Sequence, residues 1–124
     1  MSQKVAYVTG GMGCIGTAIC QRLHKEGFKV IAGCGPTRDH AKWLGEQTEQ
    51  GYTFYASVGN VGDWDSTVEA FAKTKAEHGS IDVLINNAGR SIRRSVALSY
   101  DRFHDFTRTI ELNYYGCLRL IMGF

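Results

Sequence analysis

A glycine-rich turn near the start of the chain has the residue types and spacing that can hold a phosphate group. Gly11, Gly13 and Gly16 fit the pattern G-x-G-x-x-G, between a β-branched apolar run and an amphipathic segment. Glycines at this spacing let the backbone come close to a pyrophosphate, and the N–H groups that open the next helix can bind it. The alternative is a tight strand-to-helix turn without a ligand. The flanking segments favour a dinucleotide site.

The end of the second apolar run indicates which dinucleotide would bind. Sites for NAD carry an acidic residue about 20 residues after the glycine turn, where it holds the ribose 2′-hydroxyl. Here Cys34 occupies that place, and Asp39 comes late. Gly35 and Arg38 follow Cys34, and the Arg38 guanidinium can accept a 2′-phosphate in a charge-assisted fork. We therefore expect NADP(H), with a solvated surface residue as the alternative reading of Arg38.

Strand-like and helix-like segments alternate along the whole chain. The pattern predicts strands at 4–9, 29–32, 53–58 and 81–85, and helices at 14–25, 38–50, 63–78 and from Ser99 to the end. Such alternation requires a parallel sheet covered on both faces, with strand order 3-2-1-4. The expected fold class is α/β, a Rossmann-like doubly wound parallel sheet truncated after its fourth strand. Residues 1–124 would form a single partial domain whose strand ends converge on one crevice.

Two motifs taken together resemble those of a known family. Thr9-Gly10-x-x-x-Cys14-x-Gly16 is similar to the T-G-x-x-x-G-x-G turn of the short-chain dehydrogenases/reductases, and residues 86–89 match that family's N-N-A-G motif. The resemblance implies that Asn60 and Val61 flank the adenine, and a turn that only leads into the next helix is the alternative. The expected cofactor-binding residues are Gly10, Met12, Gly13, Cys14, Ile15, Gly16, Gly35, Arg38, Asn60, Val61, Asn87, Ala88 and Gly89.

Cys14 departs from the family pattern, which usually has glycine at this place. If its φ is negative, the side chain is tolerated and only narrows the phosphate pocket, whereas a positive φ would cost roughly 1–3 kcal/mol of strain. We expect weakened cofactor binding, and a redox-sensing thiol at the helix start is the alternative role.

The family resemblance also implies which catalytic residues to look for. Its members transfer a hydride to a carbonyl, with a serine and a Y-x-x-x-K pair handling the oxygen and its proton. None of the six tyrosines has a lysine four residues later. Asn113 matches the family asparagine that helps hold a water in the proton relay, and it is the expected catalytic residue, with an exposed helix residue as the alternative. We expect this chain alone to be inactive.

Residues 2–89 are similar to the NADPH-dependent acetoacetyl-CoA reductases, which serve polyhydroxyalkanoate synthesis. The stretches that carry this likeness are AYVTGGMGCIGTAICQRL, VIAGCGP and GNVGDWDST. Beyond Gly89 the chain looks more like reductases of fatty acyl chains. The resemblance implies a 3-oxoacyl-CoA type substrate, with a fatty acyl carbonyl or a 3-oxoacyl-carrier protein as alternatives. Two other readings stay open, a non-catalytic nucleotide-binding module and a fragment with no independent role.

Composition narrows the remaining classes of function. The 124 residues carry a net charge of +2 with scattered basic residues, so nucleic acid is not an expected partner. The apolar runs are too short for a membrane span, and four widely spaced cysteines predict no metal site. We expect a cytoplasmic protein. An unpaired fourth strand, with Leu118 and Ile121 exposed, predicts a homo-oligomer or an association-prone chain.

Overall fold

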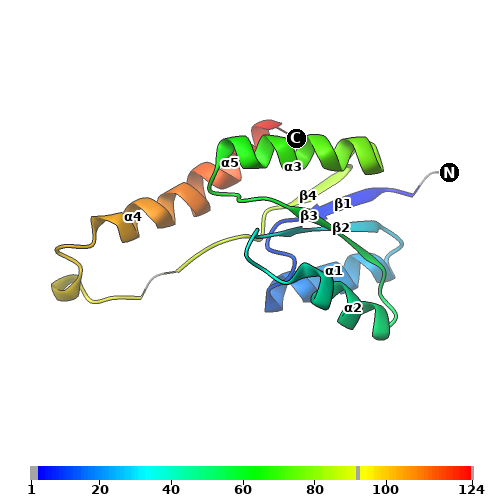
Figure 1. The fold of residues 1–124 in the computed structure, drawn as a ribbon, viewed down its shortest axis with the longest axis horizontal. Helices are drawn as coiled ribbons and strands as arrows, with labels where there is room; N and C mark the ends of the chain where they lie inside the picture. The colour runs from blue at the N-terminus through cyan, green and yellow to red at the C-terminus, as the bar shows by residue number, and fades with distance from the viewer. Residues whose placement is uncertain (1–2, 92, 124) are drawn as a thin grey trace.

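The computed structural model describes residues 3–91 and 93–123, which form a four-stranded parallel sheet with helices on both faces (Figure 1). The elements in chain order are β1 (Val5–Val8), α1 (Cys14–Lys25), β2 (Lys29–Cys34), α2 (His40–Glu49), β3 (Phe54–Val58), α3 (Trp64–His78), β4 (Val83–Ile85), the 3₁₀ turn η1 (Val96–Leu98), α4 (Phe103–Ile110), the π-helical turn η2 (Glu111–Gly116) and α5 (Cys117–Gly123).

The strand order is β3-β2-β1-β4, which confirms the predicted fold class. β1 pairs with β2 from Val5 opposite Lys29, and with β4 from Ala6 opposite Val83. Both central strands are almost wholly buried, as expected of a sheet covered on two faces. Parallel pairing puts the carboxyl ends of all four strands at one edge of the sheet.

Two hydrophobic layers hold the sheet between its helices. α1 and α2 cover one face, and α3 and α5 lie on the other (Figure 1). Trp43 of α2 stacks on Phe54 of β3 with ring centroids 5.4 Å apart, and Phe71 of α3 meets Tyr7 of β1 edge to face at 4.9 Å. Leu120 of α5 is buried in the second layer.

The second strand and second helix differ from the prediction at their ends. β2 continues to Cys34 instead of stopping at residue 32, because Gly33 and Cys34 pair with Ser57 and Val58 of β3. The helix predicted from residue 38 begins at His40. Its N-cap is Asp39, whose Oδ1 accepts a 3.1 Å hydrogen bond from the backbone N–H of Lys42. Arg38 therefore lies in the loop that follows the sheet.

The long helix predicted from Ser99 begins later and is interrupted. The Ser99 hydroxyl donates to the carbonyl of Ser95 at 2.8 Å and closes the turn after η1, so it does not cap a helix. The helix starts at Phe103, widens into a π-helical turn that contains Asn113, and resumes as α5. Phe124, the last residue of the predicted helix, lies outside the described residues, as do Met1, Ser2 and Ile92.

α4 projects away from the body of the domain, at the end of the long segment that follows β4 (Figure 1). Its apolar side chains Phe103, Phe106 and Ile110 are exposed, as are Leu118 and Ile121 of α5. The exposure predicted for Leu118 and Ile121 is thus observed. No helix in the described part of the chain has the length and hydrophobicity needed to cross a lipid bilayer.

Candidate dinucleotide site

The glycine turn between β1 and α1 needs glycine at two positions for geometric reasons. Gly10 has a φ of 62°, and a Cβ there would lie 3.0 Å from the Cα of Ala88. A Cβ on Gly16 would overlap the carbonyl oxygen of Gly10. These contacts bring the start of α1 close to the loop after β4. Gly13 is the N-cap of α1 and has no side chain over the first backbone N–H groups of that helix.

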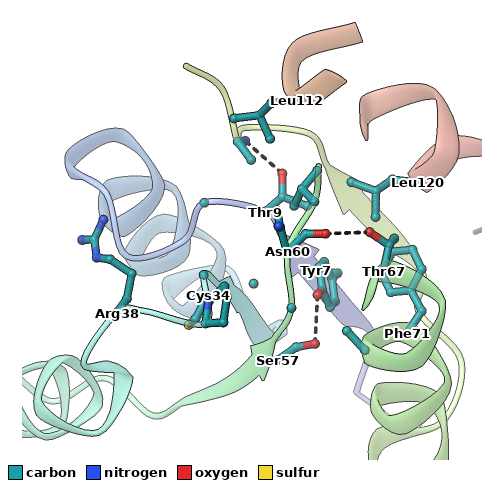
Figure 2. Close-up of a pocket in the computed structure, with 18 of the residues that line it drawn as sticks. Tyr7, Thr9, Cys34, Arg38, Ser57, Asn60, Thr67, Phe71, Leu112 and Leu120 are labelled. Carbon is teal, nitrogen blue, oxygen red and sulfur yellow. Dashed lines mark hydrogen bonds between the residues drawn. The ribbon is translucent and has the colours of Figure 1, made fainter. Parts of the chain in front are cut away.

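Thr9 joins the two motif loops (Figure 2). Its Oγ1 accepts hydrogen bonds from the backbone N–H groups of Asn87 at 3.0 Å and Ala88 at 2.9 Å. The side-chain amide of Asn87 donates to the carbonyl of Gly10 at 3.2 Å. The glycine turn and the N-N-A-G loop therefore face one another at the carboxyl edge of the sheet. The sequence contained Thr9 in its motif, but this connecting role depends on side-chain geometry.

A cavity of about 360 Å³ lies where these two loops meet. Its walls are the residues at the start of α1, the loop after β2 and the loop after β4. Among the predicted residues it is lined by Gly10, Met12, Gly13, Cys14, Ile15, Gly16, Gly35, Arg38, Asn87, Ala88 and Gly89. The open N-terminus of α1 makes this cavity suitable for a phosphate.

A second cavity of about 420 Å³ adjoins the first (Figure 2). The residues that line both cavities are Gly10, Gly33, Cys34, Gly35, Arg38 and Ala88. Asn60 and Val61 line it, which completes the set of predicted cofactor-binding residues along the two cavities. The Asn60 side chain accepts from the Gly62 N–H at 3.0 Å, so it is held within its own turn. The structure brings all thirteen residues together. Their role in binding stays a prediction.

The floor of the second cavity was not predicted from the sequence. Tyr7 donates to the Ser57 hydroxyl at 2.9 Å, and Thr74 of α3 donates to the same oxygen at 2.9 Å. Burial raises the pKa of Tyr7, a shift that the Ser57 hydrogen bond partly offsets. Tyr7 and Ser57 line the cavity, and Thr74 lies behind them, so the floor is made of linked, uncharged hydroxyl groups.

The electrostatics of the paired cavities favour an anion. No carboxylate is found among the described residues that line either one, whereas Arg38 lines both. Cys34 occupies the place of the family acid at the end of β2, and it is 3% exposed. Burial raises the pKa of its thiol to about 11, although the Arg38 charge lowers it, so Cys34 is neutral near pH 7. A 2′-phosphate would meet no negative charge here.

Cys14 occupies the first position of α1 and is exposed along the first cavity. No non-glycine residue in 3–91 and 93–123 has a positive φ, so the backbone of Cys14 is unstrained. The sequence left two cases open for Cys14, an unstrained backbone and a strained one with positive φ. The structure has the unstrained backbone, and the side chain narrows the cavity without closing it. Across those same residues, no three His, Cys, Asp or Glu side chains are grouped as a metal site requires.

Asn113 lines neither of these two cavities, although it lies next to Gly89, where a Cβ would be 3.4 Å from the Asn113 Oδ1. Its Oδ1 accepts from the backbone N–H of Arg90 at 2.7 Å, and its Nδ2 donates to the Arg90 carbonyl at 2.7 Å. The side chain thus fixes the segment that leaves the N-N-A-G loop. Asn113 sits in the π-helical turn, a distortion that often marks functional sites.

The parallel 3-2-1-4 sheet with its glycine turn and facing N-N-A-G loop defines a Rossmann-type nucleotide-binding fold. The sequence matches the short chain dehydrogenase family over residues 4–124, and the chain belongs to that family. This confirms the resemblance drawn from its two motifs.

Curated relatives agree with this placement. An acetoacetyl-CoA reductase of Cupriavidus necator is 56% identical over 114 residues, which is 91% of this chain and 46% of that protein. A fatty acyl-CoA reductase of Acinetobacter baylyi is 40% identical over 122 residues, covering 97% of this chain and 41% of that protein. The chain thus spans less than half the length of these two relatives.

Solved structures share the fold. The F189W variant of actinorhodin polyketide ketoreductase with NADPH superposes with a TM-score of 0.87 at 29% identity, covering 98% of this chain and 46% of that one. An alcohol dehydrogenase of Thermococcus sibiricus complexed with 5-hydroxy-NADP gives a TM-score of 0.81 at 30% identity, over 99% of this chain and 52% of that one.

Proposed function

We propose that this chain is the NADP(H)-binding part of a reductase that acts on a 3-oxoacyl-CoA type carbonyl. The observation that carries the proposal is the junction of the Thr9–Gly10 turn with the Asn87–Ala88 loop beside two adjoining cavities. That junction presents helix N–H groups, an arginine and no carboxylate to one groove. Such a groove suits a pyrophosphate and a phosphorylated ribose.

NADP(H) is preferred over NAD(H) because of the loop after β2. The residue where an acid would hold the 2′-hydroxyl is the neutral thiol of Cys34, and Arg38 follows in the same loop. Arg38 forms no ion pair with a carboxylate in the described part of the chain, so its charge is available to a ligand. The NADPH and 5-hydroxy-NADP in the two similar structures support this choice.

The reaction requires more than the cofactor. When bound, the nicotinamide supplies a hydride to a carbonyl carbon. On this chain, Asn113 would position the Arg90 segment beside that reaction through its two hydrogen bonds. The sequence carries no Y-x-x-x-K pair to protonate the carbonyl oxygen. We therefore expect residues 1–124 to bind cofactor without turning over substrate.

The acetoacetyl-CoA type of substrate is favoured by the 56% identity to an acetoacetyl-CoA reductase. A fatty acyl carbonyl is the second candidate, because a fatty acyl-CoA reductase is 40% identical over 97% of the chain. The match to the acetoacetyl-CoA reductase covers 91% of the chain and therefore also extends past Gly89. A 3-oxoacyl-carrier protein shares the same reacting group. A role in polyhydroxyalkanoate synthesis would follow from the first of these.

Assembly and location complete the proposal. The exposed apolar side chains of α4 and α5, which include Phe103, Phe106 and Ile110, would be covered in a homo-oligomer. Free cysteines are consistent with a reducing cytoplasm. The competing reading is a nucleotide-binding module that has no catalytic partner segment, and it shares the same cofactor site.

Titration of the isolated chain with NADPH and with NADH, followed by nicotinamide fluorescence, tests the cofactor proposal. We expect saturable binding with at least a tenfold preference for NADPH. Equal affinity for both, or binding of neither, would overturn it. Adding acetoacetyl-CoA to the NADPH complex then tests turnover, and steady oxidation of NADPH by residues 1–124 would contradict the inactive state proposed here.

A further inference from the structure

A third cavity, of about 500 Å³, lies beside the segment that begins at Arg90. It is lined by Arg90, Ser91, Arg94, Ser99, Asp105, Phe106, Thr109, Ile110 and Asn113. Its size is within the range of small-molecule sites. Arg90 also lines the second cofactor cavity, so the third cavity and the dinucleotide groove share this residue.

The charged residues that line this cavity are Arg90, Arg94 and Asp105, and they belong to an arginine-rich segment. Residues 90–110 contain five arginines and two aspartates, an excess of three positive charges, whereas the whole chain has a net charge of +2. The concentration of charge is therefore local, because the rest of the chain is slightly negative. An arginine-rich wall beside hydroxyl groups is a common recognition surface for phosphate.

Asp105 does not neutralise the arginines of this wall. Arg102 already binds it through two hydrogen bonds, from Nε to Oδ2 at 2.8 Å and from Nη2 to Oδ1 at 3.2 Å. Arg94 shares the same carboxylate at 3.3 Å. One carboxylate thus faces two guanidinium groups. Arg90 has no carboxylate partner within residues 3–91 and 93–123, and its backbone is held by Asn113.

The cavity has apolar walls as well. Phe106 and Ile110, from α4, are 53% and 50% exposed and lie along it. A ligand that fits has an anionic group for the arginines and a less polar part for these side chains. The printed names of the two curated relatives differ in the acyl group and share coenzyme A.

We infer that the third cavity binds the phosphate of an acyl-phosphopantetheine thioester, through Arg90 and Arg94 with the neighbouring Ser91 hydroxyl. The inference rests on the proposed function and adds the residues that recognise the carrier of the acyl group. The same phosphopantetheine chemistry is found in coenzyme A and in acyl carrier proteins. No bond is made or broken in this binding step.

Isothermal titration of the chain, saturated with NADP⁺, tests the inference with three ligands: coenzyme A, 4′-phosphopantetheine and pantetheine, which lacks phosphate. We expect both phosphorylated ligands to bind at least tenfold more tightly than pantetheine, with the salt dependence of an ionic contact. A much higher affinity for coenzyme A than for 4′-phosphopantetheine indicates that the nucleotide adds contacts. Equal affinity of the two indicates recognition of the phosphopantetheine that carrier proteins also bear. Pantetheine binding as tightly as coenzyme A would overturn the inference.

Arg94→Gln supplies the matched test, with Arg22→Gln as the control. Arg22 is an exposed arginine of α1 that pairs with Glu26 and is absent from the residues lining the third cavity. Arg94→Gln should weaken coenzyme A about tenfold and leave NADP⁺ affinity within twofold, whereas Arg22→Gln should change neither. Unchanged coenzyme A affinity in Arg94→Gln, or displacement of NADP⁺ by coenzyme A, would contradict the site. Failure to bind NADP⁺ would instead refute the proposed function, and the three-ligand comparison can then be run without it.

Discussion

The Oγ1 of Thr9 accepts a 2.9 Å hydrogen bond from the backbone N–H of Ala88, a residue 79 positions later in the chain. Thr9 directly follows β1 and is 1% exposed, and Ala88 lies in the loop after β4. One hydroxyl thereby fixes the distance between the glycine turn and the N-N-A-G loop. The shape of the cofactor groove depends on this contact.

Thr9→Val should destabilise the fold, because it keeps the size of the side chain and removes the acceptor of two backbone N–H groups. The partly buried N–H of Ala88 would lose its acceptor, whereas the N–H of Asn87 keeps its 3.1 Å hydrogen bond to the Ile85 carbonyl. The free energy of unfolding should therefore fall by about 1–3 kcal/mol. Thr9→Ser, which keeps the hydroxyl, is the control and should lose less than about 1 kcal/mol. Urea denaturation of the three proteins measures the difference. Equal stability of the valine and serine variants would show that the hydrogen bonds contribute little.

Arg38→Gln should lower the affinity for NADPH about tenfold and leave that for NADH within twofold, since only NADPH carries a 2′-phosphate. Arg22→Gln removes the same charge from a distant, exposed part of α1 and controls for the overall field. Fluorescence titrations of both dinucleotides provide the measurement. A parallel loss of NADPH and NADH affinity would indicate that Arg38 acts on the loop itself and makes no contact with the phosphate.

Cys14 offers a chemical probe of the groove. It is exposed along the first cavity, whereas Cys20 and Cys34 are buried and burial raises their thiol pKa values to about 12 and 11. Iodoacetamide at pH 8 should label Cys14 first. Saturating NADP⁺ should slow this labelling at least fivefold and leave the half-buried Cys117 unaffected. Peptide mass spectrometry reports both rates. No protection of Cys14 would place the dinucleotide elsewhere.

The Cys34 thiol predicts a loss of stability in alkali. Its folded pKa of about 11 exceeds the ordinary value of 9.0, so the folded state holds this proton more tightly than the unfolded state does. The resulting stabilisation is complete below pH 9 and is lost as the pH rises through 11. Cys34→Ala should therefore show a shallower fall in unfolding free energy between pH 9 and 11. Identical slopes for the two proteins would mean that the thiol is not buried in solution.

The order of the sheet and the residues along the groove could be predicted because both follow from local patterns. Alternating hydrophobic segments define a parallel sheet, and the motifs lie at strand ends that the topology must bring together. The end of β2 at Cys34 was not predicted, since its pairing with Val58 depends on another strand. Ser99 resembled an N-cap in sequence, but its hydroxyl donates a hydrogen bond to the Ser95 carbonyl across the 3₁₀ turn.

Side-chain partners outside the motifs could not be predicted either. The place of Asn113 in the proton relay stays a prediction, and its hydrogen bonds to the backbone N–H and carbonyl of Arg90 were not predicted. That pairing joins residues 23 positions apart through a π-helical turn, for which the sequence gives no periodic signal. The hydroxyl cluster of Tyr7, Ser57 and Thr74 likewise arises from three separate elements.

Amide chemical shifts recorded while NADP⁺ is added to the ¹⁵N-labelled chain test the central claim most directly. The account predicts that the largest shifts fall on residues 10–16 and 87–89, with further shifts at Gly35 and Arg38, and that NAD⁺ at the same concentration produces smaller ones. Shifts confined to other parts of the chain, or none at millimolar NADP⁺, would contradict a dinucleotide site at the junction of β1 and β4.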